Sequence, residues 1–141
     1  MIMHNNLQRF ITAPQNDYPV ALAEIKQGRK RSHWMWYIFP QIAGLGFSET
    51  SRHYALKNLD EAQDYLNHPV LGGRLVEICT ELLKLPTNNP TQIFGTPDDM
   101  KLRSCVTLFA SLPDADPVFK QVLDKFFGGE GDKLTIQILA K

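Results

Sequence analysis

The sequence predicts an all-α protein that forms one domain over residues 1–141. Apolar residues recur at helical spacing along several segments, and proline or glycine interrupts the chain at short intervals. The one stretch that favours a strand has no partner strand elsewhere in the chain. Hydrophobic residues make up 43% of the sequence and charged residues 21%, which is typical of a folded globular protein. A single core is the simplest arrangement at this length.

Capping signals mark the helices of the N-terminal half. Asp17 and Pro19 are typical of a first helical turn, and Gly28 is typical of the residue that ends a helix. A second helix begins at Asn58, whose side chain has the right spacing to form a capping box with Glu61. We therefore expect one helix from Asp17 to Gly28 and another that starts at Asn58.

The next helix has the clearest hydrophobic periodicity in the chain. His68 and Pro69 mark its start, and we expect it to run to about Leu85. Its apolar face consists of Leu71, Leu75, Ile78, Cys79, Leu82 and Leu85. Charged residues occupy the opposite side, so this helix is predicted to bury one face in the core.

Two further helices are predicted in the C-terminal half. The run Thr-Pro-Asp-Asp at 96–99 is a capping signal for a helix that continues to about Leu112. Its hydroxyl side chains are expected on the solvated face: Ser104, Thr107 and Ser111. Asp116 and Pro117 open another helix, which ends at Gly128. Residues 134–139 alternate in hydrophobicity, so both helix and strand stay open for that segment.

The segment from Trp34 to Phe39 is the hardest to assign. Its aromatic and β-branched residues favour a strand locally. An isolated strand would leave its backbone hydrogen-bonding groups unpaired. We therefore predict a short buried helix that is capped by Ser32 and ends before Pro40.

Composition argues against several classes of protein. Fifteen basic residues balance fifteen acidic ones, so no overall field attracts nucleic acid, and nucleic-acid binding is not expected. The longest apolar run is far shorter than the roughly 20 residues that cross a bilayer, and the N-terminus has no signal-peptide pattern. Cys79 and Cys105 lie on apolar helical faces, which predicts reduced core thiols and a cytoplasmic location. No ligand spacing predicts a metal or a cofactor.

Specific strings in the sequence resemble a known bacterial family. They are residues 28–51 with His-Trp-Met-Trp at 33–36, the block 93–104 ending in Pro-Asp-Asp-Met-Lys-Leu-Arg-Ser, Thr-Leu-Phe at 107–109, and Phe-Gly-Gly at 127–129 with Asp132 and Thr135. They resemble the domain of unknown function 1810, which is sometimes labelled calpastatin-like. The resemblance covers nearly the whole chain and implies packed antiparallel helices, similar to the helix pairs of α-superhelical domains. It implies no activity, and the calpastatin label describes a disordered inhibitor, whereas this composition is that of a folded domain.

The first candidate site is an abrupt junction of basic and aromatic residues. Lys30 and Arg31 end a basic run, His33 follows, and the two tryptophans are Trp34 and Trp36. Cations beside indole rings are suited to an anion attached to a flat ring. The same pattern is also expected where the surface of a domain meets its core. The sequence leaves both interpretations open.

The second candidate is the glycine-containing loop 44–48 and the segment after it. If Ser48 caps a helix, the amides of the first turn can bind an anion, with Ser51 and Arg52 close by. The spacing matches no known phosphate-binding loop. A plain helix cap after a flexible loop is the alternative.

The third candidate is a charged pair on the predicted helix that ends near Leu112. Helical projection places Asp98 and Lys101 on the side that faces the core, where opposite charges pair with each other or face a cavity. In the functional interpretation, Asp98 and Lys101 both line a pocket. In the alternative interpretation, Asp98 stabilises the helix N-terminus and the long side chain of Lys101 reaches solvent.

Three functions follow from these candidates. The leading hypothesis is a binding module for a small phosphate-bearing anion, or for an acidic segment of a protein partner. The second is an enzyme for a phosphorylated or nucleotide-like substrate, with His33 as base, Asp98 as acid or orienting group and Lys101 as electrostatic stabiliser. The third is a helical scaffold for protein interactions. A pocket that contains all three residues would favour the enzyme.

Overall fold

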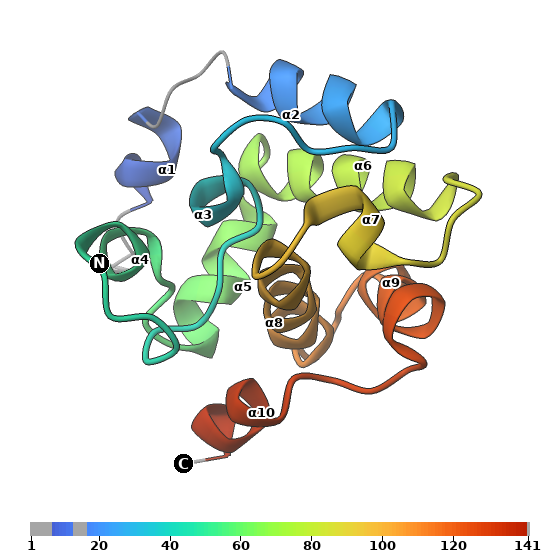
Figure 1. Ribbon diagram of the computed structural model, residues 1–141. Coiled ribbons are helices and arrows are strands. Elements are labelled where there is room, and N and C mark those ends of the chain that lie inside the picture. The colour runs from blue at the N-terminus through green and yellow to red at the C-terminus, as the bar shows by residue number, and fades with distance from the viewer. Residues whose placement is uncertain (1–6, 13–16, 141) are drawn as a thin grey trace.

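The regular structure of the chain consists of short packed helices (Figure 1). The computed structural model describes residues 7–12 and 17–140, and these residues form ten helices and no sheet. The helices are α1 (Gln8–Thr12), α2 (Asp17–Lys26), α3 (Met35–Ile38), α4 (Glu49–Tyr54), α5 (Leu59–Asn67), α6 (Leu71–Leu83), α7 (Pro90–Phe94), α8 (Asp98–Ala110), α9 (Pro117–Phe127) and α10 (Lys133–Leu139). The predicted all-α fold is therefore confirmed.

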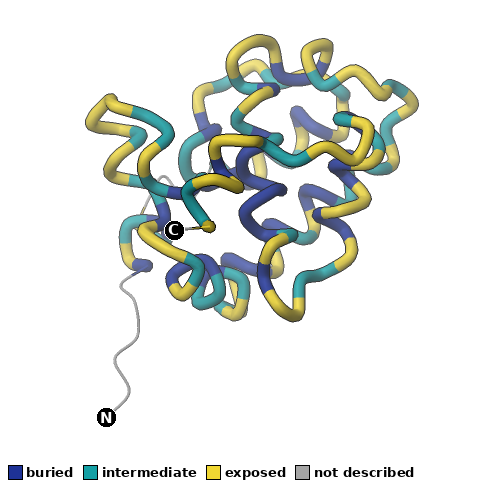
Figure 2. The backbone as a smooth tube through the Cα atoms, turned by 90° about the horizontal axis from the view of Figure 1, so that it is seen from below, coloured by how far each residue is buried: buried dark blue, intermediate teal, exposed yellow. Residues whose placement is uncertain are grey.

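Helix α8 lies at the centre of the fold. It packs against α5, α7, α9 and α10, while α6 contacts α2, α5 and α9 (Figure 1). Five of its side chains are fully buried: Leu102, Cys105, Val106, Leu108 and Phe109. Buried backbone runs through the middle of the molecule, with the exposed segments around it (Figure 2). Residues at the first turns of α8 are therefore held in place by contacts with several other helices.

The prediction that the hydroxyl side chains of α8 lie on a solvated face is wrong at two positions. Ser104 and Thr107 are buried, with 6% and 4% of their surfaces exposed. Each hydroxyl donates a hydrogen bond to the carbonyl four residues earlier, Ser104 to Met100 at 3.1 Å and Thr107 to Arg103 at 2.7 Å. A hydroxyl that is satisfied within its own helix can be buried at little cost. Helical projection alone does not reveal this.

Most predicted helix ends are confirmed. The side chain of Asn58 accepts from the Glu61 amide at 2.9 Å, and that of Asp116 accepts from the Val118 amide at 2.9 Å. Gly128 ends α9 with a left-handed φ of 63°, a conformation that suits glycine. The ambiguous segment 134–139 belongs to a helix, α10, which the side chain of Asp132 caps.

The segment after the basic run contains a shorter helix than predicted. Helix α3 covers only Met35–Ile38, it follows Trp34, and no side chain caps it. The prediction that Ser32 caps this helix is therefore wrong. The Ser32 hydroxyl donates to Glu24 at 2.6 Å instead, because that buried carboxylate requires donors from the loop.

The two cysteines lie in the core as predicted. Cys79 and Cys105 are fully buried and form no disulfide. Burial raises the pKa of both thiols above the usual value, which keeps them protonated and unreactive. Among the described residues, no helix has the length and apolarity needed to cross a membrane.

Candidate functional site

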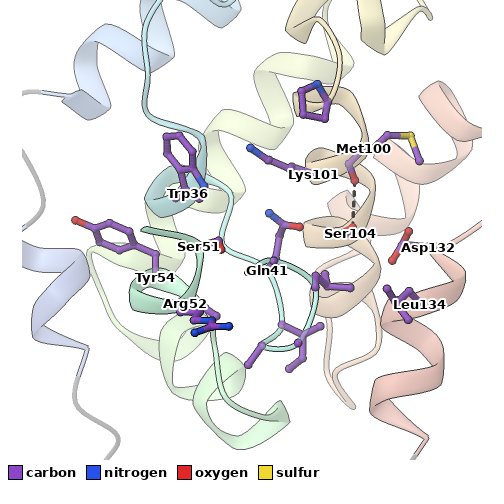
Figure 3. Close-up of a pocket in the computed structure, with 17 residues that line it drawn as sticks. Trp36, Gln41, Ser51, Arg52, Tyr54, Met100, Lys101, Ser104, Asp132 and Leu134 are labelled. Carbon is purple, nitrogen blue, oxygen red and sulfur yellow. Dashed lines mark hydrogen bonds between the residues drawn. The ribbon is translucent and has the colours of Figure 1, made fainter. Parts of the chain in front are cut away.

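A cleft of about 350 Å³ opens between the loop 41–46 with α4 on one side and α8 with the start of α10 on the other (Figure 3). Its lining is mostly apolar. The polar and aromatic members of the lining are Trp36, Gln41, Ser51, Arg52, Tyr54, Lys101, Ser104 and Asp132. The apolar members include Ile42, Leu45, Met100 and Leu134. The cleft therefore combines a hydrophobic interior with charged groups at separate points.

Backbone hydrogen bonds hold the loop that forms one wall of the cleft. The amide of Ala43 donates to the carbonyl of Leu56, and the amide of Leu56 donates to the carbonyl of Gln41, both at 2.8 Å. Gly44 has a φ of 102°, which bulky residues rarely adopt. The loop is thereby tied to the chain just beyond α4, and the Gln41 side chain is brought toward α8 (Figure 3).

A cation lies above an indole ring at one end of the cleft. The Lys101 ammonium is 4.6 Å from the centre of the Trp36 ring, a distance typical of a cation–π contact. Lys101 also forms an ion pair with Asp98, with 3.3 Å between Nζ and Oδ1. Asp98 and Lys101 therefore form an ion pair, one of the arrangements that the sequence leaves open.

Asp98 has a second cationic partner from a distant part of the chain. Lys30 Nζ lies 2.8 Å from Asp98 Oδ2, and only 9% of the Lys30 side chain is exposed. The Lys30 ammonium is also 5.2 Å from the centre of the Trp34 ring. Two ammonium groups thus share one carboxylate, so these three groups together carry one net positive charge.

A buried carboxylate shapes the loop that carries the basic run. Glu24 accepts from the amides of Arg31 and Ser32, at 2.7 and 3.0 Å, and from the indole Nε1 of Trp34 at 3.0 Å. Burial by itself raises the pKa of a carboxyl group, but these bonds and that from the Ser32 hydroxyl outweigh it and hold the pKa of Glu24 below its usual value. Glu24 therefore fixes the conformation of the loop that carries Lys30.

The structure brings some of the predicted site residues together in the cleft. Four of them line it: Trp36, Ser51, Arg52 and Lys101. Lys30 and Asp98 do not line the cleft. Asp98 is connected to it by the ion pair with Lys101, and Lys30 pairs with Asp98. Arg52 is exposed, and no described residue forms an ion pair with it.

The other predicted site residues do not line the cleft. Trp34 is fully buried, and its indole nitrogen is used by Glu24. Arg31 and His33 are exposed outside the cleft lining. Ser48 caps α4 by accepting from the Ser51 amide at 3.1 Å, so the first-turn amide that it faces is already bonded.

Several lining residues carried no signal in the sequence. Tyr54 is not part of any recognisable motif, and Gln41 lies only within the string 28–51 that carries the family resemblance. Ser104 was expected on the solvated face, and Asp132 follows a glycine-rich turn far from the other residues. Only the resemblance to family 1810 drew attention to Asp132. Among the described residues, no group of three or more histidine, cysteine or acidic side chains is placed to hold a metal.

Comparison with other proteins gives the family context of this cleft. The family model described as "Protein of unknown function (DUF1810)" matches residues 4–139. The chain is similar to the crystal structure of the conserved hypothetical protein Rv1873 from Mycobacterium tuberculosis, with a TM-score of 0.93, 43% identity and coverage of 96% of each chain. No curated protein matches the sequence significantly. Neither description assigns an activity.

Proposed function

This chain belongs to the family of proteins of unknown function DUF1810, and we propose that its cleft binds a small phosphate-bearing anion attached to a flat ring. The observation that carries the proposal is the Lys101 ammonium, held above Trp36 at the end of the cleft. A cation that is fixed before binding loses little entropy when an anion arrives.

The charge balance around Lys101 supports an anionic ligand. Asp98 is shared between Lys30 and Lys101, so it neutralises only one of the two ammonium groups. The Lys101 side chain is 24% exposed, which leaves part of it accessible from the cleft. Arg52, on the opposite wall, adds a second positive charge. These cations attract an anion even though the whole protein has no net charge.

The shape and lining of the cleft support a ligand with a ring. Its volume of about 350 Å³ lies at the lower end of the range of roughly 300–1,000 Å³ that small-molecule sites occupy. Ile42, Leu45 and Met100 provide apolar surface, and Trp36 and Tyr54 also belong to the lining. A flat ring buries apolar area against these residues while its phosphate stays at the cationic end.

The placement of the histidine favours binding over the enzymatic hypothesis. An acid–base enzyme built on His33, Asp98 and Lys101 needs the imidazole in the same cavity as the lysine. His33 is exposed and does not belong to the lining. The scaffold hypothesis makes a different prediction, which is that no small anion binds.

Phenyl phosphate is the simplest probe of the proposal. Titration is followed by tryptophan fluorescence, because Trp36 lines the cleft whereas Trp34 is fully buried. We expect binding to weaken with added salt and by about tenfold or more in Lys101→Gln, since a charge-assisted contact is lost. The matched control is Lys84→Gln, because Lys84 also pairs with an acidic residue three positions earlier but lies outside the cleft lining.

The outcomes separate the hypotheses. Equal weakening by both lysine substitutions would show that the charge acts at no particular site. Arg31→Gln tests the basic run, and we expect it to leave the affinity unchanged because Arg31 does not line the cleft. Absence of any response to phenyl phosphate, nucleotides or ADP-ribose at low salt would overturn the proposal and leave the scaffold hypothesis ahead.

A further inference from the structure

We infer that the ligand of the cleft is bipolar, with an amino group at the end of its ring opposite the phosphate, and that Asp132 receives this amino group. The inference rests on the proposed function, because it assigns the phosphate to Lys101. It adds a second recognition group and a chemical class, an amino-substituted aryl phosphate.

Asp132 is a carboxylate held in a fixed position on the cleft wall. Its amide donates to the Thr107 hydroxyl at 2.9 Å. Its Oδ2 atom accepts from the amide of Thr135 at 2.9 Å and from the hydroxyl of the same residue at 2.6 Å. Within the described chain, Oδ1 accepts no hydrogen bond and no cation pairs with Asp132. One carboxylate oxygen is therefore available to a donor in the cleft.

The positive and negative ends of the cleft are separated along helix α8. Asp132 is anchored to Thr107, which lies six residues after Lys101 in the sequence. At 1.5 Å per helical residue, the two anchor points are about 9 Å apart along the helix axis. Ser104 lies between them, with Lys101 directed toward Trp36 and Asp132 beyond Ser104 beside Leu134 (Figure 3). A single ring with a substituent at each end is the simplest ligand that reaches from one charged end of the cleft to the other.

Uncommitted polar groups occupy the middle of the cleft. The side-chain amide of Gln41 forms no hydrogen bond with any described residue. The Ser104 hydroxyl donates to Met100, but its oxygen keeps the capacity to accept. These groups lie between the two charged ends (Figure 3). A ring that spans the ends therefore meets polar partners at its edge and apolar residues on its faces.

The test compares two ligands that differ only in the amino end. Phenyl phosphate carries the anion alone, and 4-(aminomethyl)phenyl phosphate adds an ammonium group at the opposite end of the ring. We expect the second compound to bind about tenfold more tightly to the wild-type protein, because a charge-assisted hydrogen bond to Asp132 is added.

The substitution Asp132→Asn isolates the charge of that carboxylate. Asparagine caps helices as well as aspartate does, so α10 keeps its N-terminal bond to Thr135. We expect the tenfold preference to disappear in Asp132→Asn, because the ammonium group loses its charged partner; the quantity compared is the ratio of the two affinities within each variant. The matched control is Asp116→Asn, which makes the same change at the capping residue of α9, outside the cleft lining. This control should keep the preference.

The two proposals fail in different ways. If phenyl phosphate does not bind at all, the proposed function falls, and this inference falls with it. If phenyl phosphate binds but the amino compound binds no more tightly, only the bipolar ligand is rejected. A preference that persists in Asp132→Asn, or that Asp116→Asn also abolishes, shows that Asp132 is not the receiving group.

Discussion

Glu24 shows how one residue organises a functional loop. Only 8% of the surface of this residue is exposed, and its carboxylate accepts four hydrogen bonds, from two amides, one hydroxyl and one indole. No described cation forms an ion pair with it. Neutral donors thus stabilise the charge, and they belong to the residues that connect the basic run to α3. The loop conformation depends on this carboxylate.

Replacement of Glu24 should destabilise the protein strongly. Glu24→Ala leaves buried donors without an acceptor, and we expect a loss of about 2–4 kcal/mol in the free energy of unfolding. Glu24→Gln keeps one acceptor oxygen and should cost less. Urea unfolding monitored by the fluorescence of Trp34 measures both values. A loss below 0.5 kcal/mol in Glu24→Ala, the size typical of a surface change, would contradict this role.

The pH dependence of stability gives a second test of Glu24. The pKa of Glu24 is lower in the folded protein than in the unfolded chain, where the pKa of a glutamate is about 4.3. Its contribution to stability is therefore complete above that value and is lost as the pH falls through the lower folded pKa. We expect Glu24→Gln to lose less stability on acidification than the wild type. Parallel stability curves for the two proteins would contradict the expectation.

At the scale of helices, the junction between α5 and α6 depends on one glycine. A side chain at Gly72 would place its Cβ only 1.8 Å from the carbonyl oxygen of Leu66. The neighbouring Gly73 is exposed and has nothing within 4 Å of such a Cβ. The imidazole Nδ1 of His68 accepts from the amides at the start of α6, so the predicted start at His68 is close to the observed one at Leu71. The two helices therefore meet at a backbone contact.

This contact predicts opposite effects at adjacent positions. Gly72→Ala must displace the backbone of α5 or α6, and we expect a loss of about 1–3 kcal/mol or more. Gly73→Ala should raise stability by about 0.5–1 kcal/mol, because alanine favours the helix over the unfolded chain. Thermal unfolding of the two variants measures the difference. Similar effects of the two substitutions would show that α5 does not approach α6 as closely as described.

At the scale of the whole molecule, one hydrophobic cluster joins most of the helices. Its buried members extend from Leu7 to Phe126 and include Trp34, Leu75 and Phe109 from separate elements. Helix α10 packs against this cluster through Ile138 and Leu139, and Thr135 of the same helix is buried. The walls of the cleft come from residues near 41–55, 97–104 and 132–134, so its shape depends on the packing of the whole chain.

We expect the chain to unfold as one cooperative unit. In Trp36→Phe the only remaining tryptophan is Trp34, which reports on the core. Its fluorescence and the far-ultraviolet circular dichroism should then follow the same transition in urea. Two separated transitions would contradict the single domain that we expect over residues 1–141. In the wild-type protein, phenyl phosphate should shift the unfolding midpoint to a higher urea concentration.

Local sequence patterns were enough to predict much of the fold. The caps at Asn58, Asp116 and Gly128 act on neighbouring residues, and the apolar face of α6 repeats within one helix. The Asp98–Lys101 pair was predictable for the same reason, since its members are three residues apart on one helix. The short helix α7 was missed, although Asn89 caps it, because five residues are too few for a recognisable periodicity.

The sequence by itself therefore determined the helical class, most helix ends, the buried cysteines and the family, because these depend on residues close together in the chain. Tertiary structure alone decided which candidates meet. Lys30 reaches Asp98, Asp132 is anchored to Thr107, and both contacts join residues more than twenty positions apart. The cleft, the burial of Trp34 and the exposure of His33 depend on how several helices pack, and no local pattern records that packing.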